Sequence, residues 1–130
     1  MILLDTDVMI DLLRRYPPAV AWLESLGDEE LQLPGFVVME LLQRCRNRTE
    51  QEQLEKELHP YAATWPSTET CNEALAVFVN AHLSHGLGLL DALIGQTAVA
   101  LQVPLYTFND KHYAAVPALR TVQPYIKQTP

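Results

Sequence analysis

The sequence predicts an α/β fold with a mainly parallel central sheet and helices on both of its faces. Short apolar runs that suit buried strands alternate along the whole chain with longer runs of helical spacing, and this alternation is typical of parallel sheets. The chain has 130 residues, of which 48% are hydrophobic and 19% charged, which is enough apolar material for one core. We therefore expect a single domain over residues 1–130.

The first half of the chain predicts two strands and four helices. Residues 1–4 form an apolar run that predicts a buried strand, and Asp7 is placed to cap the helix that follows. Pro17-Pro18 ends that helix and can open the next, because proline fits the first helical turn. Thr49 and Glu52 have the spacing of a capping box. The predicted helices are 7–16, 19–26, 36–46 and 49–58, and the second strand is 30–33.

The second half continues the alternation. Ser67 or Thr68 can cap a long helix that runs to about residue 84, and Gly86 closes it, as glycine commonly does at a helix end. The next helix, 89–102, is apolar almost throughout and is expected to be central. The remaining predictions are strands over 63–66, 104–108 and 119–122 and a helical turn over 110–115.

Composition limits the classes of function. The formal net charge is −7 and the isoelectric point is about 4.9, which alone argues against nucleic-acid binding, although acids gathered in one site can bind cations that in turn bind phosphate. No apolar stretch reaches the ~20 residues of a membrane span, and the N-terminus does not resemble a signal peptide. Cys45 and Cys71 are too few for a disulfide framework, so we expect two thiols in a cytoplasmic protein.

Acidic residues stand in apolar surroundings at four separate places. Asp5 ends the first strand, Glu40 lies in the helix after the second strand, and Asp91 begins the apolar helix. Asn109 and Asp110 directly follow the strand 104–108. Since the carboxyl ends of parallel strands meet at one edge of a sheet, we expect these residues to converge there.

Asp5 has no simple structural explanation, because four apolar residues carry it inward. The other acids do have simpler interpretations: an N-cap for Asp91 and for Asp7, a solvent-facing position for Glu40, and an exposed position for Asp11, paired with Arg14 or Arg15.

Such a cluster would need a counter-ion. Two carboxylates about 4 Å apart repel by roughly 4 kcal/mol at an effective dielectric constant near 20. A divalent cation removes this repulsion, and ligands that are all oxygens favour Mg²⁺ or Mn²⁺ over Zn²⁺. Such an ion can hold a phosphodiester and lower the pKa of a bound water.

The stretches LLDTDVMIDLL, FVVMELLQR and GLGLLDALIGQTAVALQVPLYTFNDKHY, in this order and spacing, resemble the PIN-domain nucleases, specifically the VapC-type toxins of bacterial type II toxin–antitoxin pairs. The resemblance covers nearly the whole chain. It implies a three-layer α/β/α PIN-like domain. It also implies a divalent-metal-dependent endoribonuclease that hydrolyses RNA phosphodiester bonds with Mg²⁺ or Mn²⁺.

The resemblance also implies roles for individual residues. Asp5, Glu40 and Asp91 match the three acids of the family and would be catalytic residues and metal ligands. In Thr107-Phe108-Asn109, an amide occupies the fourth position, which removes one charge; the neighbouring Asp110 could substitute for it. The supporting positions are Thr6, Asp7 and Thr107.

The partners that the resemblance implies are an RNA substrate, a cognate antitoxin and a second copy of the chain. The antitoxin would need an apolar groove along the early helices, and the apolar faces of 19–26 and 36–42 could form a homodimer interface. One alternative is a non-catalytic PIN-fold module that binds RNA or protein, in which Asn109 marks a weakened metal site. Another is a nuclease whose substrate is DNA. Candidate residues for an RNA track are Arg14, Arg15, Arg44, Arg46, Arg48 and Lys111.

Overall fold

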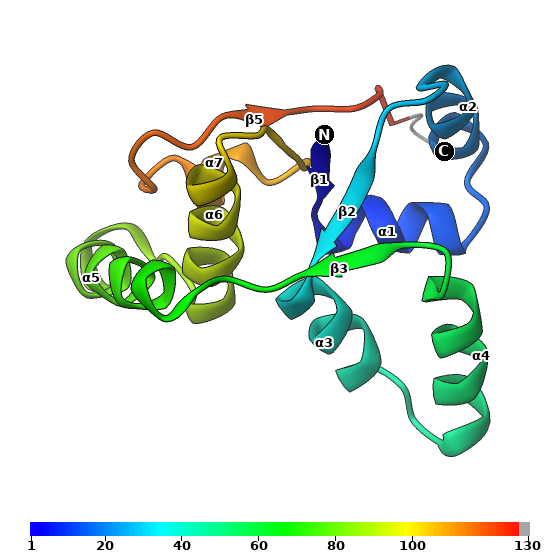
Figure 1. Cartoon of the computed structure of the whole chain (residues 1–130), viewed down its shortest axis with the longest axis horizontal. Coiled ribbons are helices and arrows are strands. Elements are labelled where there is room, and N and C mark those ends of the chain that lie inside the picture. Colours follow the sequence, from blue (N-terminus) through cyan, green and yellow to red (C-terminus); the bar gives the residue numbers. More distant parts are fainter. Residues whose placement is uncertain (128–130) are drawn as a thin grey trace.

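The computed structural model describes residues 1–127, which form five strands and seven helices (Figure 1). In chain order these elements are β1 (Ile2–Leu4), α1 (Thr6–Leu13), α2 (Pro17–Ser25), β2 (Leu31–Pro34), α3 (Gly35–Gln43), α4 (Arg48–Leu58), β3 (Ala62–Thr64), α5 (Thr68–His85), α6 (Leu89–Leu101), β4 (Leu105–Tyr106), α7 (Asp110–Tyr113) and β5 (Thr121–Val122).

The five strands form one sheet in the order β3-β2-β1-β4-β5, and every pair of neighbours is parallel. β1 is central: Ile2 pairs with Leu31 of β2, and Leu3 pairs with Leu105 of β4. Its three residues are all buried, as expected for a strand covered on both faces. Figure 1 shows α5 and α6 on one side of the sheet and α1 and α2 on the other. The predicted three-layer α/β fold is confirmed.

The parallel arrangement brings several chain turns to the carboxyl edge of the sheet. β1 ends at Leu4 and α1 follows after one residue, while β2 continues into α3 without a loop. β4 is followed by the short segment 107–109 before α7 begins. Side chains distant in sequence therefore meet at this edge.

Two predicted helix caps were wrong by two residues. Asp5, not Asp7, is the N-cap of α1, and its carboxylate accepts a hydrogen bond from the Thr6 N–H. The N-cap of α4 is Asn47, whose side chain accepts from the Glu50 N–H, so Thr49 does not start a capping box. In both cases two good capping residues stand two positions apart. The predicted Ser67 cap and Gly86 end of α5 are confirmed.

Several helices and strands are shorter in the structure than the sequence predicted. The helix predicted over 7–16 ends at Leu13, because Arg14 is its C-cap and Arg15 has a φ of 58°. The helix predicted over 36–46 runs from Gly35 to Gln43. The strands predicted over 104–108 and 119–122 are limited to the two residues each that pair with their neighbours.

A row of exposed apolar side chains lies on α5. Leu75, Val79 and Leu83 recur at every fourth residue of this helix, and 58%, 66% and 91% of their surfaces are exposed. The expected dimer faces on 19–26 and 36–42 are different: most of their apolar side chains pack against the core. These are Ala19, Trp22, Leu23, Leu26, Phe36, Val37, Val38 and Leu41. None of the described helices is long and apolar enough to cross a membrane.

Candidate metal centre

Asp5 lies at the centre of the carboxyl edge and is almost fully buried, with 4% of its surface exposed. Its Oδ1 accepts a hydrogen bond from the Thr6 N–H and its Oδ2 accepts one from the Thr107 hydroxyl, each at 2.8 Å. Burial raises the pKa of Asp5 from 3.8 to about 6, and the neighbouring Asp7 adds to this rise, against the hydrogen bonds that favour the charged form. The structure thus holds a carboxylate where its ionisation is costly.

Asp7 joins α1 to the segment after β4. Its Oδ2 accepts a hydrogen bond from the Phe108 N–H at 2.8 Å and lies 3.4 Å from the Thr107 hydroxyl, while its Oδ1 accepts from the Val8 N–H. Burial raises the pKa of Asp7. Asp7 therefore fixes the loop that carries Thr107 and Asn109, a role that could not be predicted from residues a hundred positions apart.

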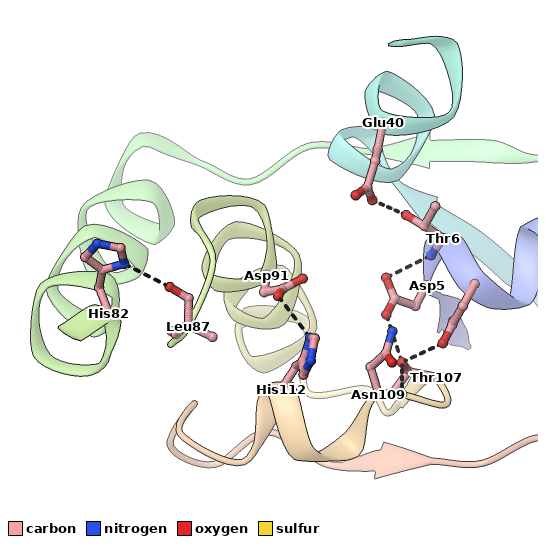
Figure 2. A network of polar contacts seen from close by, with 10 residues as sticks. Asp5, Thr6, Glu40, His82, Leu87, Asp91, Thr107, Asn109 and His112 are labelled. Atoms are coloured by element: carbon pink, nitrogen blue, oxygen red, sulfur yellow. Dashed lines mark hydrogen bonds and ion pairs between the residues drawn. The ribbon is translucent and has the colours of Figure 1, made fainter. Parts of the chain in front are cut away.

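Glu40 reaches the site from α3 and is half-buried. One of its carboxylate oxygens accepts a hydrogen bond from the Thr6 hydroxyl, so the first residue of α1 positions an acid of α3 (Figure 2). This contact excludes a purely solvent-facing position for Glu40.

Asp91 lies in the first turn of α6 and is not its N-cap, which is Gly88. Its Oδ2 is 3.8 Å from His112 Nδ1, at the edge of α7. Burial raises the pKa of Asp91; His112 opposes this rise and Glu40 adds to it. The influence of Glu40 shows that these two carboxylates face a common space, as Figure 2 also shows.

The two candidates for the fourth position differ in where they lie. The Asn109 N–H donates to the Thr107 hydroxyl oxygen at 3.0 Å, and Figure 2 shows Asn109 beside Asp5. Asp110 is the first residue of α7, and both Asn109 and Asp110 are exposed.

The side chain of Tyr113 also reaches this site, and the sequence analysis did not single it out. Only 2% of its surface is exposed, and its hydroxyl is buried without a hydrogen-bond partner of normal geometry among the described residues. Burial raises its pKa, as do the negative charges of Asp5 and Asp91. Burying a hydroxyl unpaired costs about 1–3 kcal/mol. Its position in NDKHY, an aromatic residue three after Asp110, was the available signal.

The acids have no strong internal counter-charge. Within residues 1–127, no lysine or arginine forms an ion pair with Asp5, Glu40 or Asp91. No three His, Cys, Asp or Glu side chains of these residues are close enough to hold one ion together. Several carboxylate oxygens, held by hydrogen bonds, and one orphaned hydroxyl fit a hydrated divalent cation, bound directly to one or two acids and through water to the others.

Asp11 differs from its expected pairing with Arg14 or Arg15. Its Oδ2 accepts from the Tyr125 hydroxyl at 2.7 Å and lies 3.3 Å from Lys127 Nζ. Lys127 also lies 4.4 Å from the centre of the Phe108 ring. The segment after β5 is thereby attached to α1 and to the loop of the acidic site.

Most candidate residues for an RNA track are exposed without an acidic partner. Arg46 is the exception, because it forms an ion pair with Glu50 at 2.9 Å. The candidates that form no ion pair within residues 1–127 are Arg14, Arg15, Arg44, Arg48 and Lys111.

Comparison with known proteins identifies relatives of this architecture. The sequence profile of the PIN domain family matches residues 2–119. No curated protein matches the chain. A chain of FitAcB from Neisseria gonorrhoeae is 26% identical, with a TM-score of 0.71 over 95% of this chain and 98% of that one. A chain of a toxin–antitoxin complex from Klebsiella pneumoniae is 24% identical, with a TM-score of 0.75 over 96% and 98%. A chain of VapBC2 from Rickettsia felis, bound to a promoter DNA fragment, is 22% identical, with a TM-score of 0.75 over 94% and 98%.

Proposed function

Because the chain belongs to the PIN domain family, we propose that it is a divalent-metal-dependent endoribonuclease and the toxin of a toxin–antitoxin pair. The observation that carries this proposal is Asp5, a buried acid whose pKa is raised to about 6. It shares the carboxyl edge of the sheet with Glu40 and Asp91 and has no basic partner among the described residues. A group that costs stability when ionised is typical of a functional site.

In this proposal Asp5, Glu40 and Asp91 hold Mg²⁺ or Mn²⁺, directly or through water. When bound, the cation would neutralise the acids, hold a phosphodiester and lower the pKa of a water. Thr6 orients Glu40. Thr107 orients Asp5.

The fourth position is the weakest part of the site. We propose that Asn109 fills it, because its N–H is bound to the Thr107 hydroxyl and it lies beside Asp5 (Figure 2), although both Asn109 and Asp110 are exposed. Its amide oxygen can accept a hydrogen bond from a water but brings no charge. The same observation favours the alternative, a non-catalytic module that binds RNA or protein.

The test is cleavage of a pool of structured RNAs by the purified protein in Mg²⁺, in Mn²⁺ and in EDTA. Asp5→Asn serves as the inactive variant, and Asp28→Asn makes the same charge change at an exposed position in a turn. We expect metal-dependent cutting by the wild type and by Asp28→Asn but not by Asp5→Asn. Cutting that survives both EDTA and Asp5→Asn would refute the proposal. RNA binding without cutting would favour the non-catalytic module.

We propose that the antitoxin docks in the cleft between α1, α2 and α4. This cleft has a volume of about 240 Å³, and its lining combines four aliphatic side chains with a tyrosine and one residue of each charge. Its lining is Leu12, Leu13, Arg15, Val20, Leu23, Glu57 and Tyr61. Co-expression with the product of a small neighbouring open reading frame should yield a complex with the wild type, and Val20→Glu should break it.

We propose that the chain forms a homodimer through α5. Leu75, Val79 and Leu83 make an uncharged exposed row on this helix, and two copies with a net charge of −7 each can approach most easily along such a row. Sedimentation should give the mass of a dimer for the wild type and of a monomer for Val79→Glu. A wild-type monomer at high protein concentration would refute the dimer.

A further inference from the structure

Tyr113 closes the short helix α7 and is held by packing against α6. A methyl group placed on Gly95 of α6 would lie 3.4 Å from Tyr113 Cδ1, so the Tyr113 ring rests directly on the backbone of that helix. The ring is one of the buried residues of the main core. The position of the hydroxyl is therefore set by the contact between α6 and α7, and it cannot turn away to solvent.

The hydroxyl points into the acidic site without a normal hydrogen bond. It is buried and unpaired among the described residues, and it lies near enough to Asp5 and Asp91 to favour their charged forms. Native proteins pair nearly all buried polar groups, so an unpaired donor between two acceptors requires an explanation.

The two acids differ in how well they are held. Asp5 already accepts from the Thr6 N–H and the Thr107 hydroxyl. Asp91 lies 3.8 Å from His112, and within residues 1–127 it accepts no hydrogen bond of normal geometry. The Tyr113 hydroxyl is within reach of both acids, and Asp91 is the one that lacks a second donor of normal geometry among the described residues.

We propose that Tyr113 is a positioning residue of the metal centre, whose hydroxyl donates a hydrogen bond to Asp91 when a divalent cation is bound and so sets the place of Asp91 relative to Asp5. The inference rests on the proposed function. A phenol hydroxyl has one hydrogen-bond donor, and here it is buried with no other acceptor of normal geometry among the described residues. One carboxylate oxygen of Asp91 would then accept the hydrogen bond from Tyr113, and the other would be free to face the ion. Hydrogen bonds of this kind orient the ligands at many metal sites.

The test is calorimetric titration with Mn²⁺ alone, without RNA, on Tyr113→Phe, which keeps the ring and removes only the hydroxyl. Tyr61→Phe, which removes a phenol hydroxyl near α4 and far from the acids, is the matched control. We expect Tyr113→Phe to bind Mn²⁺ about tenfold more weakly than the wild type and Tyr61→Phe to bind as the wild type does.

Thermal unfolding in EDTA separates this role from a purely structural one. Because the hydroxyl is unpaired without metal, we expect Tyr113→Phe to unfold at the wild-type temperature or above it. Equal Mn²⁺ affinity of Tyr113→Phe and the wild type would overturn this inference and leave the proposed function standing. If neither the wild type nor Asp5→Asn bound Mn²⁺, both this inference and the proposed function would be overturned.

Discussion

Replacing Asp5 with asparagine should stabilise the metal-free protein at neutral pH. The pKa of Asp5 rises from 3.8 to about 6 on folding, so the native state takes up its proton more tightly than the unfolded chain does. The stability that this provides is complete below pH 3.8 and is lost as the pH rises through about 6. At about 1.4 kcal/mol for each tenfold change in proton affinity, the loss at pH 7.5 is about 3 kcal/mol.

The asparagine side chain keeps most of the hydrogen bonds. Its oxygen can accept from the Thr6 N–H, and its amide can donate to the Thr107 hydroxyl oxygen, which can in turn donate to Asp7, 3.4 Å away. Allowing about 1 kcal/mol for the less favourable arrangement leaves a net gain of about 2 kcal/mol. For a domain of this size that corresponds to a rise in Tm of about 8 °C.

The assay is calorimetric unfolding at pH 7.5 and at pH 4, in EDTA and in Mn²⁺. In EDTA we expect Asp5→Asn to unfold above the wild type at pH 7.5 and near it at pH 4. Saturating Mn²⁺ should raise the Tm of the wild type but not that of the variant, because only the wild type binds the ion tightly. A variant that unfolds well below the wild type in EDTA at pH 7.5 would refute the reasoning, because ionised Asp5 would then stabilise the fold.

Three further changes test other parts of the site and fold. Thr6→Val removes the hydroxyl that holds Glu40 and should weaken Mn²⁺ binding about tenfold in a titration, with little change in Tm. Asn109→Asp should strengthen Mn²⁺ binding, whereas Asp110→Asn should leave it unchanged; the opposite pattern would assign the fourth position to Asp110. Gly86→Ala should lower the stability by about 1 kcal/mol, measured by urea unfolding, because Gly86 ends α5 with a φ of 67°. Its Mn²⁺ binding should stay at the wild-type level.

The order of elements could be predicted from the sequence because each depends on local pattern. Apolar runs, prolines and Gly86 each determine the conformation of only the few residues around them. The parallel topology then places Asp5, Glu40 and Asp91 at one edge of the sheet. The PIN domain resemblance is confirmed on the same stretches.

The contacts that join distant segments could not be predicted. The helix caps illustrate this. The choice of Asp5 over Asp7 depends on where β1 ends, and the choice of Asn47 over Thr49 depends on how the chain passes from α3 to α4. Asp11 has two arginines three and four residues after it in sequence but pairs with Lys127, in the segment after β5. Tyr113 was not singled out in the sequence, and only the fold shows that its ring is in the core and its hydroxyl is buried without a partner of normal geometry among the described residues.

The central position of β1 sets the order in which a ribosome can complete the acidic site. Asp5 is made almost at once, but its partner Thr107 lies beyond most of the chain, as does the β4 strand that pairs with β1. The residues that line the cleft between α1, α2 and α4 all lie between Leu12 and Tyr61 in the sequence, so they are synthesised well before Thr107. An antitoxin that binds this cleft, as proposed, would thus find its docking residues made before the acidic site can be assembled.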